Sequence, residues 1–184
     1  MRVTIYDKVA WPGFMQWCLK TSWLLGCVFQ KLVGAVDDYY GASSWEDAKA
    51  WLDSKGSLSS IQYWGHGSPG VVWLAGEAVP TSAWLSLKPL LLPDSVIWFR
   101  VCDAFQGTAG QVFSRTLANG LGCTIAGHTR IIGIWQGGLY TRTPNSFPSW
   151  SITEGGEPSW LREDLKPWNK HTILCLRTSI PKGW

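Results

Sequence analysis

The sequence is poor in charge. Asp, Glu, Lys and Arg make up 16% of its 184 residues, and no two Lys or Arg residues are adjacent. A nucleic-acid-binding surface needs clustered cations that displace counterions from the phosphates. The basic residues are scattered singly here and the net charge is only +3, so we expect no nucleic-acid partner.

Long apolar runs are also missing. Residues 14–36 form the most apolar region, but two Gln and two Lys interrupt it before it reaches the roughly 20 residues of a membrane span. Residues 1–13 contain an acid and several polar side chains where a signal peptide has a continuous apolar stretch. These absences predict a cytoplasmic protein without membrane insertion.

The cysteines lack the spacing of a metal site. No C-x-x-C pair occurs, and zinc ribbons need such closely spaced ligands. An odd number of cysteines also cannot form a complete disulfide framework. We expect reduced thiols and no metal, with one thiol free for a special role; the five are Cys18, Cys27, Cys102, Cys123 and Cys175.

Aromatic residues are abundant, with 14 Trp, 5 Tyr and 6 Phe, and 46% of the chain is hydrophobic. This composition and length predict one folded domain over residues 1–184. Most Trp residues fall on predicted helices and strands, where a core uses them. Four tryptophans fall in or just before the Gly- and Pro-rich segment 137–170, which lacks periodicity: Trp135, Trp150, Trp160 and Trp168. These side chains could form the wall of a substrate cleft, contact a partner, or pack the domain.

Strand and helix patterns alternate along the chain. Helices are predicted from apolar spacings of three and four, and strands from β-rich or continuous apolar runs. The alternation favours a three-layer α/β/α domain with a mostly parallel central sheet. The predicted strands are 3–6, 61–64, 71–74, 95–101, 123–127, 131–135 and 172–180. The predicted helices are 14–32, 44–52, 81–91 as far as Pro89, and 107–121. In the first helix, Trp23 and Cys27 lie away from the main apolar stripe.

Two predicted strands end beside potentially reactive residues. The first runs into His66 within a Gly-rich turn, and the second runs into Cys102. Functional groups gather beyond the carboxyl ends of parallel strands, so neighbouring strands would bring this base and this nucleophile together. Gly67 allows a tight turn, and its amide, with that of Cys102, would stabilise an oxyanion.

This pattern resembles the caspase-like cysteine peptidases, and most closely their bacterial group. The resemblance covers about residues 59–138: a strand with His66-Gly67, a spacing of 36 residues, a strand with Cys102, then Gly110, Leu117-Ala118 and Leu121-Gly122. It implies His66 as general base, Cys102 as nucleophile and no cofactor. It also implies a protein substrate and a regulatory or defence role with a proteolytically activated partner. The chain departs from caspases in having Val101 and Asp103 beside the nucleophile.

Arg100 precedes Cys102 by two residues, so strand periodicity sends both side chains to the same face. In the family this position helps to form the pocket for the substrate side chain, and a cation there would favour Asp or Glu. Asp103, His128 and Arg130 are expected at the same rim and could shape that pocket. Arg100 could equally pair with Asp103 and contact no substrate.

The sequence therefore predicts a cysteine endopeptidase, with cleavage after an acidic residue. An inactive caspase-like module that holds a peptide or partner protein is the alternative. A zinc site from His66, Cys102, Asp103 and His128 matches no common ligand spacing. Carbohydrate binding through exposed Trp faces is a further interpretation.

Overall fold

The computed structural model describes residues 1–9, 14–155, 168 and 170–184. Elements alternate along the chain as the sequence patterns predict. In chain order they are β1 (Arg2–Asp7), α1 (Phe14–Leu32), β2 (Asp38–Ala42), α2 (Trp45–Asp53), β3 (Leu58–Trp64), β4 (His66–Ser68), β5 (Val71–Leu74), β6 (Glu77–Val79), α3 (Thr81–Leu85), a 3₁₀ turn (Lys88–Leu90), β7 (Leu91–Arg100), α4 (Gly107–Leu121), β8 (Thr124–His128), β9 (Trp135–Gln136), β10 (Leu139–Arg142) and β11 (Ile173–Leu174).

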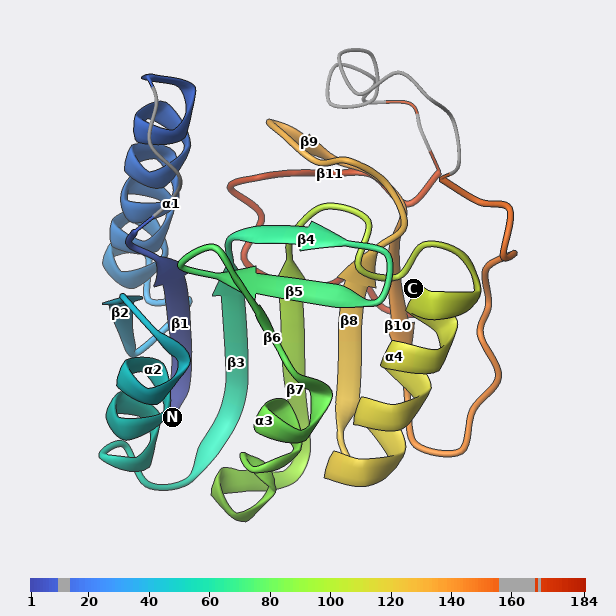
Figure 1. Cartoon of the computed structure of the whole chain (residues 1–184), viewed down its shortest axis with the longest axis horizontal. Coiled ribbons are helices and arrows are strands. Elements are labelled where there is room, and N and C mark those ends of the chain that lie inside the picture. Colours follow the sequence, from blue (N-terminus) through green and yellow to red (C-terminus); the bar gives the residue numbers. More distant parts are fainter. Residues whose placement is uncertain (10–13, 156–167, 169) are drawn as a thin grey trace.

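A six-stranded sheet forms the centre of the domain, with strand order β10-β8-β7-β3-β1-β2 (Figure 1). All neighbouring pairs are parallel except β10, which runs antiparallel to β8 at one edge. The central strands β3 and β7 are almost continuously buried near their carboxyl ends, which explains their unbroken apolar runs. The prediction of a mixed α/β fold with a mostly parallel sheet is confirmed.

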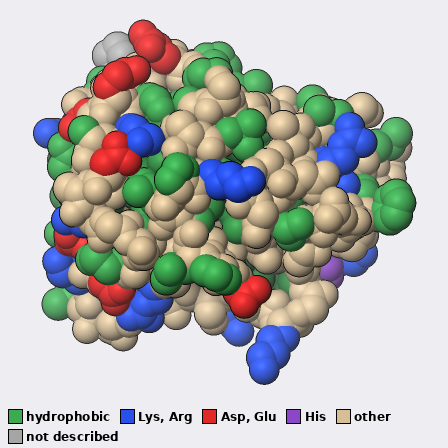
Figure 2. Space-filling model, turned by 90° about the horizontal axis from the view of Figure 1, so that it is seen from below, with side chains coloured by type: hydrophobic (Ala, Val, Ile, Leu, Met, Phe, Trp, Pro, Cys, Tyr) green, Lys and Arg blue, Asp and Glu red, His purple; other side chains and the backbone are tan. Residues whose placement is uncertain are grey.

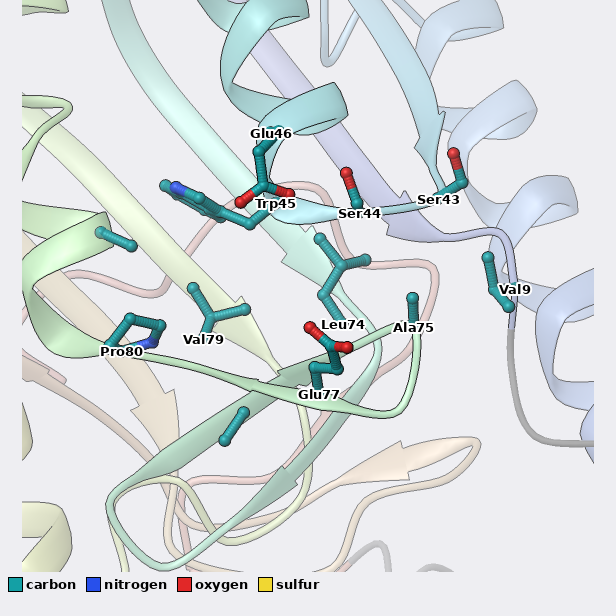
Figure 3. Close-up of a pocket in the computed structure, with 12 residues that line it drawn as sticks. Val9, Ser43, Ser44, Trp45, Glu46, Leu74, Ala75, Glu77, Val79 and Pro80 are labelled. Atoms are coloured by element: carbon teal, nitrogen blue, oxygen red, sulfur yellow. The ribbon is translucent and has the colours of Figure 1, made fainter.

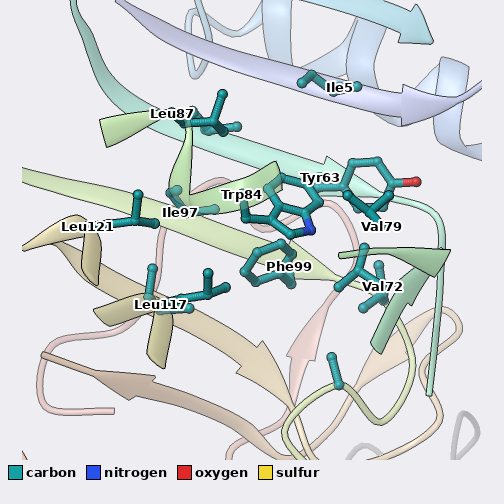
Figure 4. Packing of buried hydrophobic residues seen from close by; sticks show 14 of the residues in the cluster. Ile5, Tyr63, Val72, Val79, Trp84, Leu87, Ile97, Phe99, Leu117 and Leu121 are labelled. Atoms are coloured by element: carbon teal, nitrogen blue, oxygen red, sulfur yellow. The ribbon is translucent and has the colours of Figure 1, made fainter. Parts of the chain in front are cut away.

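One face of the sheet packs against α2, α3 and α4. Trp84 from α3 is fully buried at the centre of this core, between Tyr63 of β3 and Phe99 of β7 (Figure 4). Leu52 of α2 and Leu117 of α4 belong to the same cluster. The abundant aromatic residues of the strands therefore serve largely as packing material.

Helix α1 packs on the opposite face, but with a different side from the one its apolar stripe predicts. Trp23, Cys27 and Gln30 are buried, whereas Leu25 and Leu32 are 62% and 81% exposed. One close contact on the buried side depends on a glycine, because a Cβ at Gly26 would lie 2.7 Å from the Trp64 ring. The absence of a side chain at Gly26 lets the helix approach the aromatic surface of the sheet at this point.

Other boundaries also differ from the sequence prediction. Helix α3 ends at Leu85 instead of Pro89, the turn predicted around His66 contains strand β4, and strands β2 and β6 are not among the predicted strands. Residues 131–134 form a loop, and only Trp135–Gln136 is strand. Strand β10 lies within the segment predicted as irregular, and the predicted last strand shrinks to Ile173–Leu174. Segments that pair by so few residues have little periodicity for a sequence pattern to reveal. The expected Pro12-Gly13 break lies outside the described residues.

A separate three-stranded antiparallel sheet, β4-β5-β6, lies across the carboxyl ends of the central strands (Figure 1). At the other end, where the strands begin, acidic and basic side chains are interspersed without a large patch of either sign (Figure 2). None of the helices in the described residues is long and apolar enough to cross a membrane.

Candidate active site

His66 and Cys102 follow two adjacent strands at the same edge of the central sheet. Strands β3 and β7 are parallel neighbours, and their last paired residues are Trp64 and Arg100. Each candidate residue lies two positions beyond its strand's paired end. The sheet register therefore brings the predicted base and the predicted nucleophile to equivalent positions.

Close backbone packing fixes this arrangement. A Cβ on Gly67 would lie 2.3 Å from the carbonyl oxygen of Cys102 and 2.5 Å from Cγ2 of Val101, so only glycine fits there. The amide of Gly70 also donates to the carbonyl oxygen of Ala104 at 3.2 Å. The chain around His66 is thus attached to the segment around Cys102.

The Cys102 sulfur contacts the loop between β8 and β9. The amide of Ile132 donates to Sγ at 3.5 Å, and Sγ donates to the carbonyl oxygen of Ile132 at 3.8 Å. The amide contact favours negative charge on sulfur, whereas the carbonyl contact favours the protonated thiol, so the two act in opposite directions. These contacts could not be foreseen, because the sequence pattern of residues 131–135 favours a strand.

The His66 ring is half-buried and packs edge-on against Trp23 of α1, with 5.2 Å between the ring centroids. Burial lowers the pKa of His66 from its usual value, and the negative charge of Asp7 opposes this shift. The imidazole is therefore neutral at pH 7, which is the form that accepts a proton.

Asp7 is a site residue that the sequence reasoning missed. It ends β1, the strand on the other side of β3, and its side chain is buried. Its carboxylate accepts from the amides of Val9 and Ala75 at 3.0 and 3.1 Å. Functional groups gather at the carboxyl ends of parallel strands, and this rule applies to β1 as well as to β3 and β7. The same rule therefore identifies Asp7 from the sequence.

Replacing Asp7 with Asn is expected to lower the pKa of His66 further, because the substitution removes the negative charge that favours the imidazolium. NMR titration of the three histidines measures this directly, whether or not the protein is an enzyme. Asp53→Asn is the matched control, since Asp53 pairs with Lys49 at the far end of α2. An unchanged or higher His66 pKa in the Asp7 variant would contradict the assignment.

The Arg100 side chain lies in the protein interior. The prediction that it binds an acidic substrate side chain conflicts with this burial. The side chain is only 2% exposed and lies between the rings of Trp64 and Trp98, 4.3 Å from each centroid. All five of its N–H groups have acceptors inside the protein. These acceptors are the side chains of Gln62 and Gln136 and the carbonyl oxygens of Cys175 and Arg177.

The neighbours of Cys102 form a tight turn. Asp103 has a left-handed backbone with φ of 53°, which is uncommon outside glycine and costs free energy. Its amide donates to the carbonyl oxygen of Arg130 at 3.1 Å. The backbones of Asp103 and Arg130 therefore lie side by side next to Cys102, and α4 begins five residues beyond Cys102, at Gly107.

His128 is fully buried and does not reach a substrate surface. Its Nδ1 bonds to the carbonyl oxygen of Gly137 at 3.0 Å. Burial lowers the pKa of His128 to about 3, and the charge of Arg100 adds to this effect. Its predicted role in the substrate pocket conflicts with this burial.

The buried His128 predicts acid sensitivity. In the unfolded chain it binds a proton near pH 6.5, but in the folded chain it does so only near pH 3, so stability is present above pH 6.5 and is lost as pH falls. This single group should cost about 2 kcal/mol between pH 8 and pH 5. Urea unfolding at both pH values should show this loss in the parent protein, and His128→Asn should lose about 2 kcal/mol less. Equal losses in both proteins would contradict the prediction.

The Trp-rich segment has two kinds of tryptophan. Trp150 is buried, stacks on Phe105 and donates from Nε1 to the carbonyl oxygen of that residue, so it packs the domain. Trp135 is half-buried in β9, and Trp168 is 78% exposed. Trp160 lies outside the described residues.

Within the described parts of the chain, no three His, Cys, Asp or Glu side chains are grouped as a metal site would require. Comparison of the chain with family models, with characterised proteins and with solved structures finds no significant match. The function is therefore argued from the geometry of the site.

Proposed function

We propose that this chain is a cysteine endopeptidase with a three-layer caspase-like domain. Cys102 is the nucleophile and His66 is the general base. The observation that carries the proposal is the register of β3 and β7, with Gly67 packed on the Cys102 carbonyl. Parallel neighbouring strands bring a base and a thiol to the same edge of the sheet, which supports a pair that nucleophilic catalysis needs within hydrogen-bond reach.

The chemistry uses groups of this chain alone. His66 takes the thiol proton, and the Cys102 sulfur attacks the substrate carbonyl carbon. The amides of Gly67 and Cys102 are assigned to the oxyanion that develops. The C–N bond then breaks, the amine leaves with the proton from His66, and water hydrolyses the thioester to restore the thiol.

Asp7 acts in this scheme as a positioning residue. Its charge favours the imidazolium that forms when His66 holds the proton, so the carboxylate assists the proton transfer without touching the substrate. A buried acid behind a histidine base has the same role in other nucleophilic hydrolases.

An electrophilic peptide probe tests the proposal. We expect a mixture of peptidyl fluoromethyl ketones to form a covalent adduct on Cys102, located by mass spectrometry of the digested protein. Cys102→Ala should remove the adduct, whereas Cys18→Ala, at an exposed thiol on α1, should leave it unchanged. Absence of an adduct at Cys102 would overturn the peptidase and favour an inactive binding module.

A further inference from the structure

A pocket of about 460 Å³ opens between the start of α2 and the hairpin of β5 and β6 (Figure 3). This volume is within the range of small-ligand sites. Its apolar walls include Trp45 from α2, Leu74 from β5 and Val79 from β6. Such walls suit the aliphatic part of a long side chain.

The charged residues of the pocket have one sign. Glu46 extends from the first turn of α2, and Glu77 extends from β6 on the opposite wall (Figure 3). Both are exposed, and neither takes part in an ion pair among the described residues. Two carboxylates in the lining of one pocket favour a cation by charge, and the Trp45 ring in the same lining offers cation–π attraction.

The strand beside the pocket has an open edge. Among the residues that the structure describes, β6 pairs only with β5, and all three residues of β6 line the pocket. An unpaired edge of this kind offers main-chain hydrogen bonds to an extended peptide. A peptide that pairs there would place a side chain between Glu46 and Glu77.

The lining of the pocket also contacts Asp7, whose negative charge affects the pKa of His66. Val9 and Ala75 line the pocket, and their amides both donate to the Asp7 carboxylate. Asp7 in turn acts on His66. An extended chain bound along β6 is thus connected to the site through one buried residue.

We propose that this pocket binds a Lys or Arg side chain of an extended polypeptide that pairs with β6. Its use as a substrate subsite rests on the proposed peptidase function, whereas the binding itself does not. The proposal replaces the acidic preference expected from Arg100 with a preference for basic residues. The apolar walls match the alkyl stem of such a side chain, Glu46 and Glu77 match its cation, and the edge of β6 matches the main chain of the peptide.

Binding is measured on the full chain with Cys102→Ala, which removes cleavage. The probes are fluorescein-labelled alanine heptapeptides with a central arginine or its neutral analogue citrulline. We expect at least about tenfold tighter binding of the arginine peptide by fluorescence anisotropy. Glu77→Gln and Glu46→Gln should each reduce this preference, whereas Asp53→Asn should keep it, because Asp53 lies at the far end of α2.

The outcomes separate the two proposals. If the arginine peptide binds through Glu46 and Glu77 but Cys102 forms no adduct with the electrophilic probe, the proposed binding pocket is supported and the peptidase proposal is overturned. If the unmodified protein cleaves arginine and citrulline peptides equally, and Glu77→Gln changes nothing, the pocket is overturned while the peptidase stands. Equal affinity of both peptides for the Cys102→Ala protein also overturns the pocket.

Discussion

Replacing Cys102 with Ala is expected to reduce peptide hydrolysis by at least about a thousandfold. The thiol supplies the atom that bonds to the substrate carbonyl, so its removal leaves only background hydrolysis. We expect His66→Ala to cause a loss of similar size, because the base and the nucleophile act in the same step. The measurement is kcat/KM on quenched fluorescent peptides.

The double variant of His66 and Cys102 should be no slower than Cys102→Ala alone, because two residues that act as a unit give non-additive effects. Cys18→Ala is the matched control, since that thiol is exposed on α1. A Cys102→Ala protein that keeps more than a tenth of the parent activity would identify another nucleophile. Thermal unfolding of each variant separates a catalytic loss from a folding defect.

The central part of the fold follows from the sequence because its signals are local and strong. The apolar run before Cys102 suits a strand buried on both faces, and β7 lies at the middle of the sheet. The Ser44 cap also predicts the start of α2, and its Oγ accepts from the Asp47 amide at 3.1 Å. With these elements in place, the strand-end rule leads to His66 and Cys102.

The environment of each side chain could not be predicted in the same way. Arg100 lies in a strand, and periodicity gives its face but not what covers that face. Residues 175–177 cover it, and their carbonyl oxygens are acceptors that no local pattern identifies. The same limit applies to α1, whose buried side includes Gly26 against the Trp64 ring, a long-range contact that the apolar spacing within the helix does not reveal.

Arg100→Met is expected to lower the free energy of unfolding by about 3–5 kcal/mol, because it leaves several buried acceptors unsatisfied at about 1–3 kcal/mol each. Burial lowers the pKa of Arg100 to about 9, so the guanidinium is still charged at pH 7. It is the donor to two buried glutamines and to two carbonyl oxygens of the C-terminal segment. Methionine fills part of the volume between Trp64 and Trp98 but leaves these acceptors without donors.

Urea unfolding measures the loss, with Arg2→Met as the matched control. Arg2 pairs with Asp37 at the surface, so its replacement should cost less than about 1 kcal/mol. If Arg100→Met does not fold, Arg100→Lys keeps the charge with fewer donors and should expose the amides of residues 173–177 to faster hydrogen exchange. A loss below about 1 kcal/mol in Arg100→Met, or unchanged exchange in Arg100→Lys, would show that the guanidinium does not hold this segment.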